Sequence, residues 1–240
     1  MLRSGNPALR GDAFTRQGTD SSAGTMTIAG TANKTILLLI IAFITASLVW
    51  SHQQASAMLL FPSLIIGLII AMVTIFKKEY SPITAPLYAA VEGVLLGTIS
   101  SYFNAQYPGI VIQAVALTFA VLLCMLGAYR SGLIKVTERF KLGVVAATGG
   151  IMVVYLVSMV MSFFGANIGF IHSNGLLGIG FSVFVIIIAS LNLVLDFDLI
   201  EKGADVGAPK YMEWYGAFAL IVTLVWLYLE ILRLLAKLRR

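Results

Sequence analysis

Residues 175–203 read GLLGIGFSVFVIIIASLNLVLDFDLIEKG, a long apolar run that ends in three polar side chains, Asn192, Asp196 and Asp198. A helix that crosses a bilayer needs about 20 predominantly apolar residues, and this run supplies them. We therefore predict a transmembrane helix over 175–195 with carboxylates at its end. Polar residues are common at the ends of such helices, but Asn192 is flanked by apolar residues, which favours a functional role.

The two aspartates are expected to face different surroundings. On a helix Asn192 and Asp196 share a face, whereas Asp198 points about 200° away from Asp196. Asp198 would pair with Lys202, one turn on, at a solvated helix end. Asp196 continues the polar line of Asn192 toward the bundle interior, where loss of solvation favours the neutral carboxyl. We predict that Asp196, and not Asp198, is the gate residue that senses pH.

The composition excludes a soluble protein. Of the 240 residues 59% are hydrophobic and only 11% are charged, which is more apolar surface than a soluble domain of this size can bury. The net charge of +5 comes from short basic segments between apolar runs, so it indicates membrane topology and not nucleic-acid binding. The single cysteine, Cys124, excludes an internal disulfide and a CxxC site.

Seven apolar runs predict an all-α polytopic membrane protein, a seven-transmembrane-helix bundle. They cover residues 35–50, 56–76, 84–103, 109–129, 143–164, 175–195 and 215–236. The first run is short for a span, which requires tilt or a thin bilayer. Residues 1–33 contain no long apolar run, so we expect a disordered cytoplasmic tail, with a transit peptide as the alternative, followed by a transmembrane domain over 34–240.

Basic residues fall in alternate connections between the runs, which places the N-terminus in the cytoplasm. They include Lys77, Lys78, Arg130, Lys135, Arg139, Lys141, Lys202 and Lys210. The C-terminal basic residues do not follow this rule. Seven spans would place on the outside Arg233, Lys237, Arg239 and Arg240. A re-entrant or partly inserted last helix therefore stays open, although the length of the last run favours seven spans.

Two acidic residues lie well inside apolar runs, Glu92 in LYAAVEGVLLGT and Glu230 in VWLYLEILRLL. A charged residue there costs about 2.5–3.5 kcal/mol on insertion scales, so each is a functional candidate. Glu92 would lie about 12 Å in from Thr84, on the same side of the membrane as Asp196. We expect these two carboxylates to face one another in a polar inner half, with a nearly dry outer half. Glu230 is either functional or paired with Arg233.

Other motifs are few. Gly93 and Gly97 form a GxxxG step, which predicts close helix contact in a compact bundle. The sequence has no P-loop, HExxH or nucleophile elbow, and no clustered metal ligands. We therefore expect a protein that is not an enzyme and that holds neither a cofactor nor a bound metal.

The segments EG at 92–93, LDFDLIEKG at 195–203 and LYLEILRLLAKL at 227–238 resemble the Bax inhibitor motif family. The tail segment RSGNPALRGDAF at 3–14 is similar to that of its bacterial branch. The resemblance covers nearly the whole chain. It implies a multi-pass protein of the bacterial inner membrane in which an acidic pair between the sixth and seventh helices senses protons and gates a calcium leak.

Within that resemblance Asp196 matches the first aspartate of the pair, and Lys77 or Lys78 falls where a basic latch residue is expected. The seventh-helix aspartate has two candidates. One alignment places Glu230 there and the other places Thr223 there. If Thr223 is correct, the pair is broken and Glu92 becomes the expected partner of Asp196.

Two functions follow from the resemblance. The first is a pH-sensitive leak channel for calcium or another cation, which suits carboxylates at a membrane constriction because calcium prefers oxygen ligands. The alternative is a non-conducting regulator that binds a membrane protease or other membrane proteins in a stress response. Besides the lipid bilayer and the permeant ion, a membrane protein is therefore a candidate partner, and no nucleic acid is expected. The candidate gate residues are Asp196, Glu92 and Glu230, supported by Asn192, Asp198, Thr223, Lys77 and Lys78.

Overall fold

The computed structural model describes residues 24–50, 53–164 and 175–239. Its helices are α1 (Ile28–Trp50), α2 (Gln53–Phe76), the 3₁₀ turn η3 (Lys78–Tyr80), α3 (Ser81–Gln106), α4 (Ile110–Arg130), α5 (Glu138–Phe163), α7 (Leu176–Asp205) and α8 (Met212–Leu238). Seven of them are long and apolar enough to cross a membrane. The predicted all-α, seven-helix fold is confirmed, and the protein is a multi-pass membrane protein.

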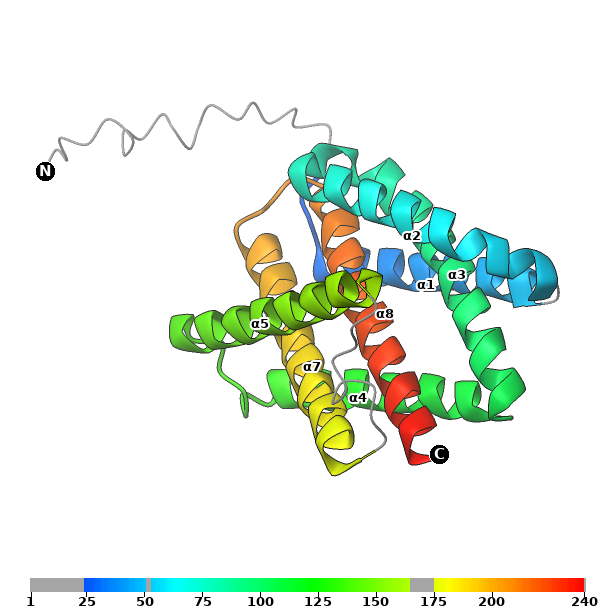
Figure 1. Cartoon of the computed structure of the whole chain (residues 1–240). Coiled ribbons are helices and arrows are strands. Elements are labelled where there is room, and N and C mark those ends of the chain that lie inside the picture. Colours follow the sequence, from blue (N-terminus) through cyan, green and yellow to red (C-terminus); the bar gives the residue numbers. More distant parts are fainter. Residues whose placement is uncertain (1–23, 51–52, 165–174, 240) are drawn as a thin grey trace, which may run out of the picture.

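Helix α8 lies at the centre of the bundle. It packs against α1, α3, α4 and α7, while α5 packs on α7 and α2 packs on α3. Figure 1 shows α7 and α8 side by side along much of their length. The main core cluster follows this contact and includes the fully buried Leu193 on α7 and Leu227 on α8. Any change in the spacing of α7 and α8 therefore affects the centre of the protein.

Local sequence explains where several helices begin. The Thr137 hydroxyl accepts a hydrogen bond of 3.2 Å from the Phe140 N–H, which caps the start of α5. A proline, Pro82, stands in the first turn of α3, where its missing N–H costs nothing. Gly207 has a φ of 64° in the turn between α7 and α8, a conformation that favours glycine.

Contacts define the two ends of the bundle. We call the end at which α1 and α8 begin the proximal end. Ser81 at the start of α3 donates a hydrogen bond to the Tyr211 carbonyl there, and Lys141 near the start of α5 lies 3.4 Å from Asp198 near the end of α7. At the opposite, distal end, Lys237 near the end of α8 contacts Gly178 near the start of α7. The helices therefore alternate in direction, as seven consecutive spans require.

Two helices are longer than predicted. Helix α1 has 23 residues and begins at Ile28, because the small residues before Lys34 continue the helix, so the first span is not short. Residues 24–33 are not a loose tail: Met26 is 3% exposed and its N–H donates to the Ala208 carbonyl at 2.7 Å. The rest of the predicted tail lies outside the described residues. Helix α7 continues to Asp205 and has 30 residues.

The GxxxG step packs closely, as predicted. A Cβ atom added at Gly97 would lie 2.5 Å from the Ala46 carbonyl oxygen, and one at Gly93 would collide with Ala42 and Thr45. Glycine at these positions therefore lets the backbones of α1 and α3 approach one another.

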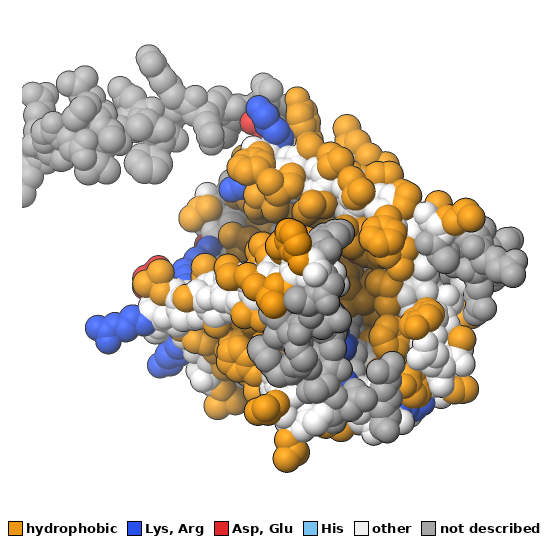
Figure 2. Space-filling model, viewed as in Figure 1, with side chains coloured by type: hydrophobic (Ala, Val, Ile, Leu, Met, Phe, Trp, Pro, Cys, Tyr) orange, Lys and Arg blue, Asp and Glu red, His pale blue; other side chains and the backbone are white. Residues whose placement is uncertain are grey.

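The surface is apolar. Phe43, Phe61 and Leu123 are each more than half exposed. Figure 2 shows hydrophobic side chains over most of the visible face, with lysine and arginine gathered where α5 begins. Such a surface suits hydrocarbon and not water.

Candidate functional site

Asp196 and Thr223 connect the two central helices. The Thr223 hydroxyl on α8 donates a 2.6 Å hydrogen bond to the carboxylate of Asp196 on α7. Thr223 is 7% exposed and Asp196 is partly buried. Of the two candidate partners for Asp196, the structure therefore pairs it with Thr223 and not with Glu230.

Asn192 does not continue this line toward α8. Its amide donates to the Thr148 hydroxyl on α5 at 2.8 Å and to the Ile188 carbonyl at 2.9 Å. The predicted polar face of α7 is thus divided between two neighbours, with Asn192 bound to α5 and Asp196 bound to α8.

Asp198 forms the predicted ion pair with Lys202, at 2.7 Å, but its predicted hydration is wrong. Only 9% of the residue is exposed, and Lys141 approaches its carboxylate at 3.4 Å. The reason is that α7 does not end near Leu195, so Asp198 lies within a continuing helix beside the start of α5. Two lysines therefore lie against this carboxylate and balance its charge.

Glu92 does not face Asp196. It is 9% exposed, and its carboxyl group lies against α2, where a Cβ atom at Gly67 would be 3.4 Å from its Oε1. The Tyr88 hydroxyl, one turn earlier on α3, donates to it. The expected shared pocket of Glu92 and Asp196 is therefore absent from the described structure.

Glu230 is paired. It is 2% exposed, and its Oε1 accepts hydrogen bonds from Arg233 at 2.9 Å and from the Tyr155 hydroxyl at 2.7 Å. The pairing with Arg233 that the sequence left open is therefore present, and the same arginine also donates to Tyr155.

The distal half of the bundle is not dry, contrary to the prediction. Besides the Glu230 group, Lys237 is 8% exposed and donates to the Gly178 carbonyl and the Ser182 hydroxyl, both at 2.9 Å. Arg239 donates to the Pro108 carbonyl at 3.0 Å. These contacts explain the basic C-terminus, because its side chains bind other helices and turns of the protein.

The proposed latch lysines do not pair with Asp196. Lys77 and Lys78 are exposed, and the described residues contain no ion pair of either with a carboxylate. Lys78 instead lies 5.1 Å from the ring centre of Tyr215. Tyr215 lies about two turns before Thr223 on α8, so this lysine contacts the helix that holds the partner of Asp196.

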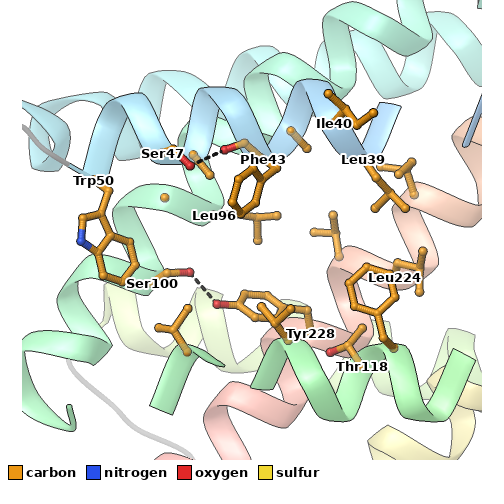
Figure 3. Close-up of a pocket in the computed structure, with 18 of the residues that line it drawn as sticks. Leu39, Ile40, Phe43, Ser47, Trp50, Leu96, Ser100, Thr118, Leu224 and Tyr228 are labelled. Carbon is orange, nitrogen blue, oxygen red and sulfur yellow. Dashed lines mark hydrogen bonds between the residues drawn. The ribbon is translucent and has the colours of Figure 1, made fainter. Parts of the chain in front are cut away.

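A cavity of about 590 Å³ lies between α1, α3, α4 and α8 (Figure 3). Aliphatic and aromatic side chains form most of its wall, including Leu39, Phe43 and Leu224. Its main polar contact is between the Ser100 and Tyr228 hydroxyls, whose oxygens are 2.6 Å apart. The cavity is thus an apolar space beside the centre of α8. No group of three acidic, histidine or cysteine side chains that would hold a metal lies among the described residues.

The sequence profile of the family described as Bax inhibitor 1 like matches residues 6–240. The chain belongs to this family. A search of curated proteins finds no match. In this Bax inhibitor 1 like protein, Asp196 thus meets a hydroxyl across the α7–α8 contact.

One charged cluster of this Bax inhibitor 1 like protein was not anticipated. Glu213 is fully buried at the start of α8 and binds Lys34 on α1 and, at 2.8 Å, Lys210. It also accepts hydrogen bonds of 2.9 Å from both the N–H and the hydroxyl of Thr27. A carboxylate in the first turn of a helix, three residues after a lysine, was the available signal. The cluster closes the proximal end.

Proposed function

We propose that the protein is a pH-sensitive leak channel for cations, with calcium as the permeant ion, in the bacterial inner membrane. The proximal end faces the cytoplasm, and Asp196 is the gate. The supporting observation is the hydrogen bond between Asp196 and Thr223, which joins the two central helices at a titratable group.

The gate works through the charge of one carboxyl group. When protonated, Asp196 is neutral and stays in the contact between α7 and α8. When it loses the proton, a charge remains in a region of low solvation, and no lysine or arginine among the described residues forms an ion pair with it. Such a charge draws in water and separates the helices. The carboxylate oxygens then attract calcium, so flux rises with pH.

The apolar cavity supports a closed state. Ile221 and Leu224, which flank Thr223 on α8, both line it. A hydrophobic space of this kind blocks ions while it is dry and passes them when it is hydrated. Separation of α7 from α8 would therefore open the proximal side and allow water to reach the cavity.

The test is calcium flux from liposomes that contain the purified protein, measured at mildly acidic and mildly alkaline pH. Asp196→Asn keeps nearly the same shape and removes the titration, so flux should lose its pH dependence. Asp198→Asn is the matched control and should keep that dependence, because Asp198 is paired with Lys202 and Lys141 and does not take part in the contact between Asp196 and Thr223. An equal response of both variants, or of neither, would contradict the gate.

The same experiment addresses the alternative function. Folded protein that gives no flux at any pH would contradict a channel and would favour a non-conducting regulator that binds other membrane proteins. We propose transport and not an enzymatic activity, because the site offers a titratable contact between helices and no nucleophile with an adjacent base.

A further inference from the structure

Glu92 lies near the middle of α3, a helix long enough to cross a membrane. It is eleven residues after Ser81, the first residue of α3, so it lies about 16 Å along a helix that crosses a hydrocarbon layer about 30 Å thick. Only 9% of the residue is exposed. The α7–α8 gate does not use it.

The carboxyl group of Glu92 is only half satisfied. The Tyr88 hydroxyl donates to it, but its Oε2 is buried and has no hydrogen-bond partner. Buried polar atoms are normally paired, so such an atom indicates a group that binds something further. Oε2 of Glu230 is also unpartnered, but that carboxylate has an arginine at 2.9 Å.

Within the described residues no lysine or arginine forms an ion pair with Glu92. Helix α2, which faces it, contains no ionisable side chain, and Tyr88 on α3 is its titratable neighbour. Of the other elements that pack on α3, η3 contributes Lys78 and Glu79 at its start, and α4 contributes Tyr129 and Arg130 at its end. Helix α1 contributes Lys34, which is bound to Glu213. Helix α8 contributes Glu213, Glu230 and Arg233, which form ion pairs of their own, and Lys237, which binds Gly178 and Ser182. An unpaired carboxylate in hydrocarbon is so costly that the group takes up a proton instead.

We propose that Glu92 is a proton-binding site in the α2–α3 contact, separate from the gate, and that it is a modification site for membrane-soluble carbodiimides. These reagents react with protonated carboxyl groups. The carboxyl oxygen bonds to the central carbon of the carbodiimide, and the carboxyl proton moves to one of its nitrogens. The acyl group then migrates to a nitrogen and gives a stable N-acylurea. The reaction is an addition, so nothing leaves and no oxidant is needed.

The reagent has a route to Glu92 from the lipid. Leu64 and Leu68 on α2 are 49% and 61% exposed, so this helix borders the hydrocarbon. Opposite the carboxyl group α2 carries Gly67, which has no side chain to cover it. At this position the backbone of α2, and no side chain, therefore lies opposite the carboxyl group of Glu92.

The test uses the full chain in liposomes, treated with dicyclohexylcarbodiimide and mapped by peptide mass spectrometry. We expect an adduct on Glu92, with a labelling rate that falls as the pH is raised. A water-soluble carbodiimide should not label this residue, because it does not enter the hydrocarbon. Since the adduct is mapped on the unmodified sequence, the result does not depend on how a variant folds.

Variants of the protein test whether the adduct forms on Glu92. Glu92→Gln should abolish the adduct, whereas Asp196→Asn and Glu230→Gln should leave it unchanged. Gly67→Ala adds a methyl group beside the carboxyl and should slow labelling several-fold, whereas Gly127→Ala, which meets open space on α4, should not. An unlabelled Glu92, a rate independent of pH, or an adduct confined to another carboxyl group would overturn the proposal. None of these readouts requires ion flux, so the proposed proton site is tested independently of the proposed leak channel.

Discussion

Thr223 on α8 donates a 2.6 Å hydrogen bond to Asp196 on α7, from the position where one alignment with the Bax inhibitor motif family expects an aspartate. Across this contact Asp196 therefore meets a hydroxyl and not a second carboxyl group. A single carboxyl group binds or releases its proton without a like charge beside it, so its titration is simpler than that of a coupled pair.

Thr223→Asp should restore a pair of carboxyl groups at this contact. Two carboxylates within hydrogen-bonding distance repel each other, so they share one proton and hold it to a higher pH. The pH at which calcium flux rises should therefore move upward relative to the wild-type protein. Liposome flux over a series of pH values measures this shift.

The control for that substitution is Thr223→Val, which keeps the shape of the side chain and removes the hydroxyl. Asp196 then loses its donor, which disfavours the ionised form, but no second charge is added. The rise in flux should therefore also move upward in pH, but by less than in Thr223→Asp, because the repulsion between two carboxylates is absent. A curve identical for Thr223→Asp and the wild-type protein would show that the two positions do not interact.

Sequence spacing predicted the seven helices because hydrophobic length is set by the bilayer and is local in the chain. It also gave the direction of Asp198 relative to Asp196. It did not show what lies on that side, because Lys141 comes from another helix. The Glu213 cluster was missed for the same reason: its partner Lys34 is 179 residues away in sequence. The direction in which a side chain points is set by its own helix, whereas the burial of that side chain depends on the neighbouring helices.

Glu213→Gln should destabilise the protein strongly. The carboxylate is fully buried, and its removal leaves Lys34 and Lys210 without a counter-charge at the proximal end. Because both lysines reach solvent, the cost is that of the hydrogen bonds to the charged carboxylate, which contribute about 1.5–3 kcal/mol each. Thermal unfolding in detergent should therefore show a clearly lower midpoint. Glu138→Gln is the control, since the side chain of Glu138 is 85% exposed and its pair with Lys141 should contribute less than about 1 kcal/mol.

Gly97→Ala should destabilise the contact between α1 and α3. The new methyl group would lie 2.5 Å from the Ala46 carbonyl oxygen and 2.8 Å from the Ala46 Cα, and backbone atoms cannot rotate away. Overpacking of this kind costs about 1–3 kcal/mol. Gly127→Ala places its methyl group in open space, so it should be neutral or slightly stabilising through helix propensity. Equal unfolding midpoints for the two variants would contradict the close approach.

Lys78 and Lys77 should differ in their effect on the gate. Lys78 lies 5.1 Å from the ring centre of Tyr215, about two turns before Thr223 on α8, whereas no hydrogen bond, ion pair or ring contact joins the Lys77 side chain to α8 within the described residues. Lys78→Glu replaces a cation over the ring with an anion that repels it. It should loosen the start of α8 and raise calcium flux at acidic pH, while Lys77→Glu, with the same change of net charge, should leave flux nearly unchanged. An equal rise in both variants would indicate a general effect of surface charge and would exclude a specific role for the contact between Lys78 and Tyr215.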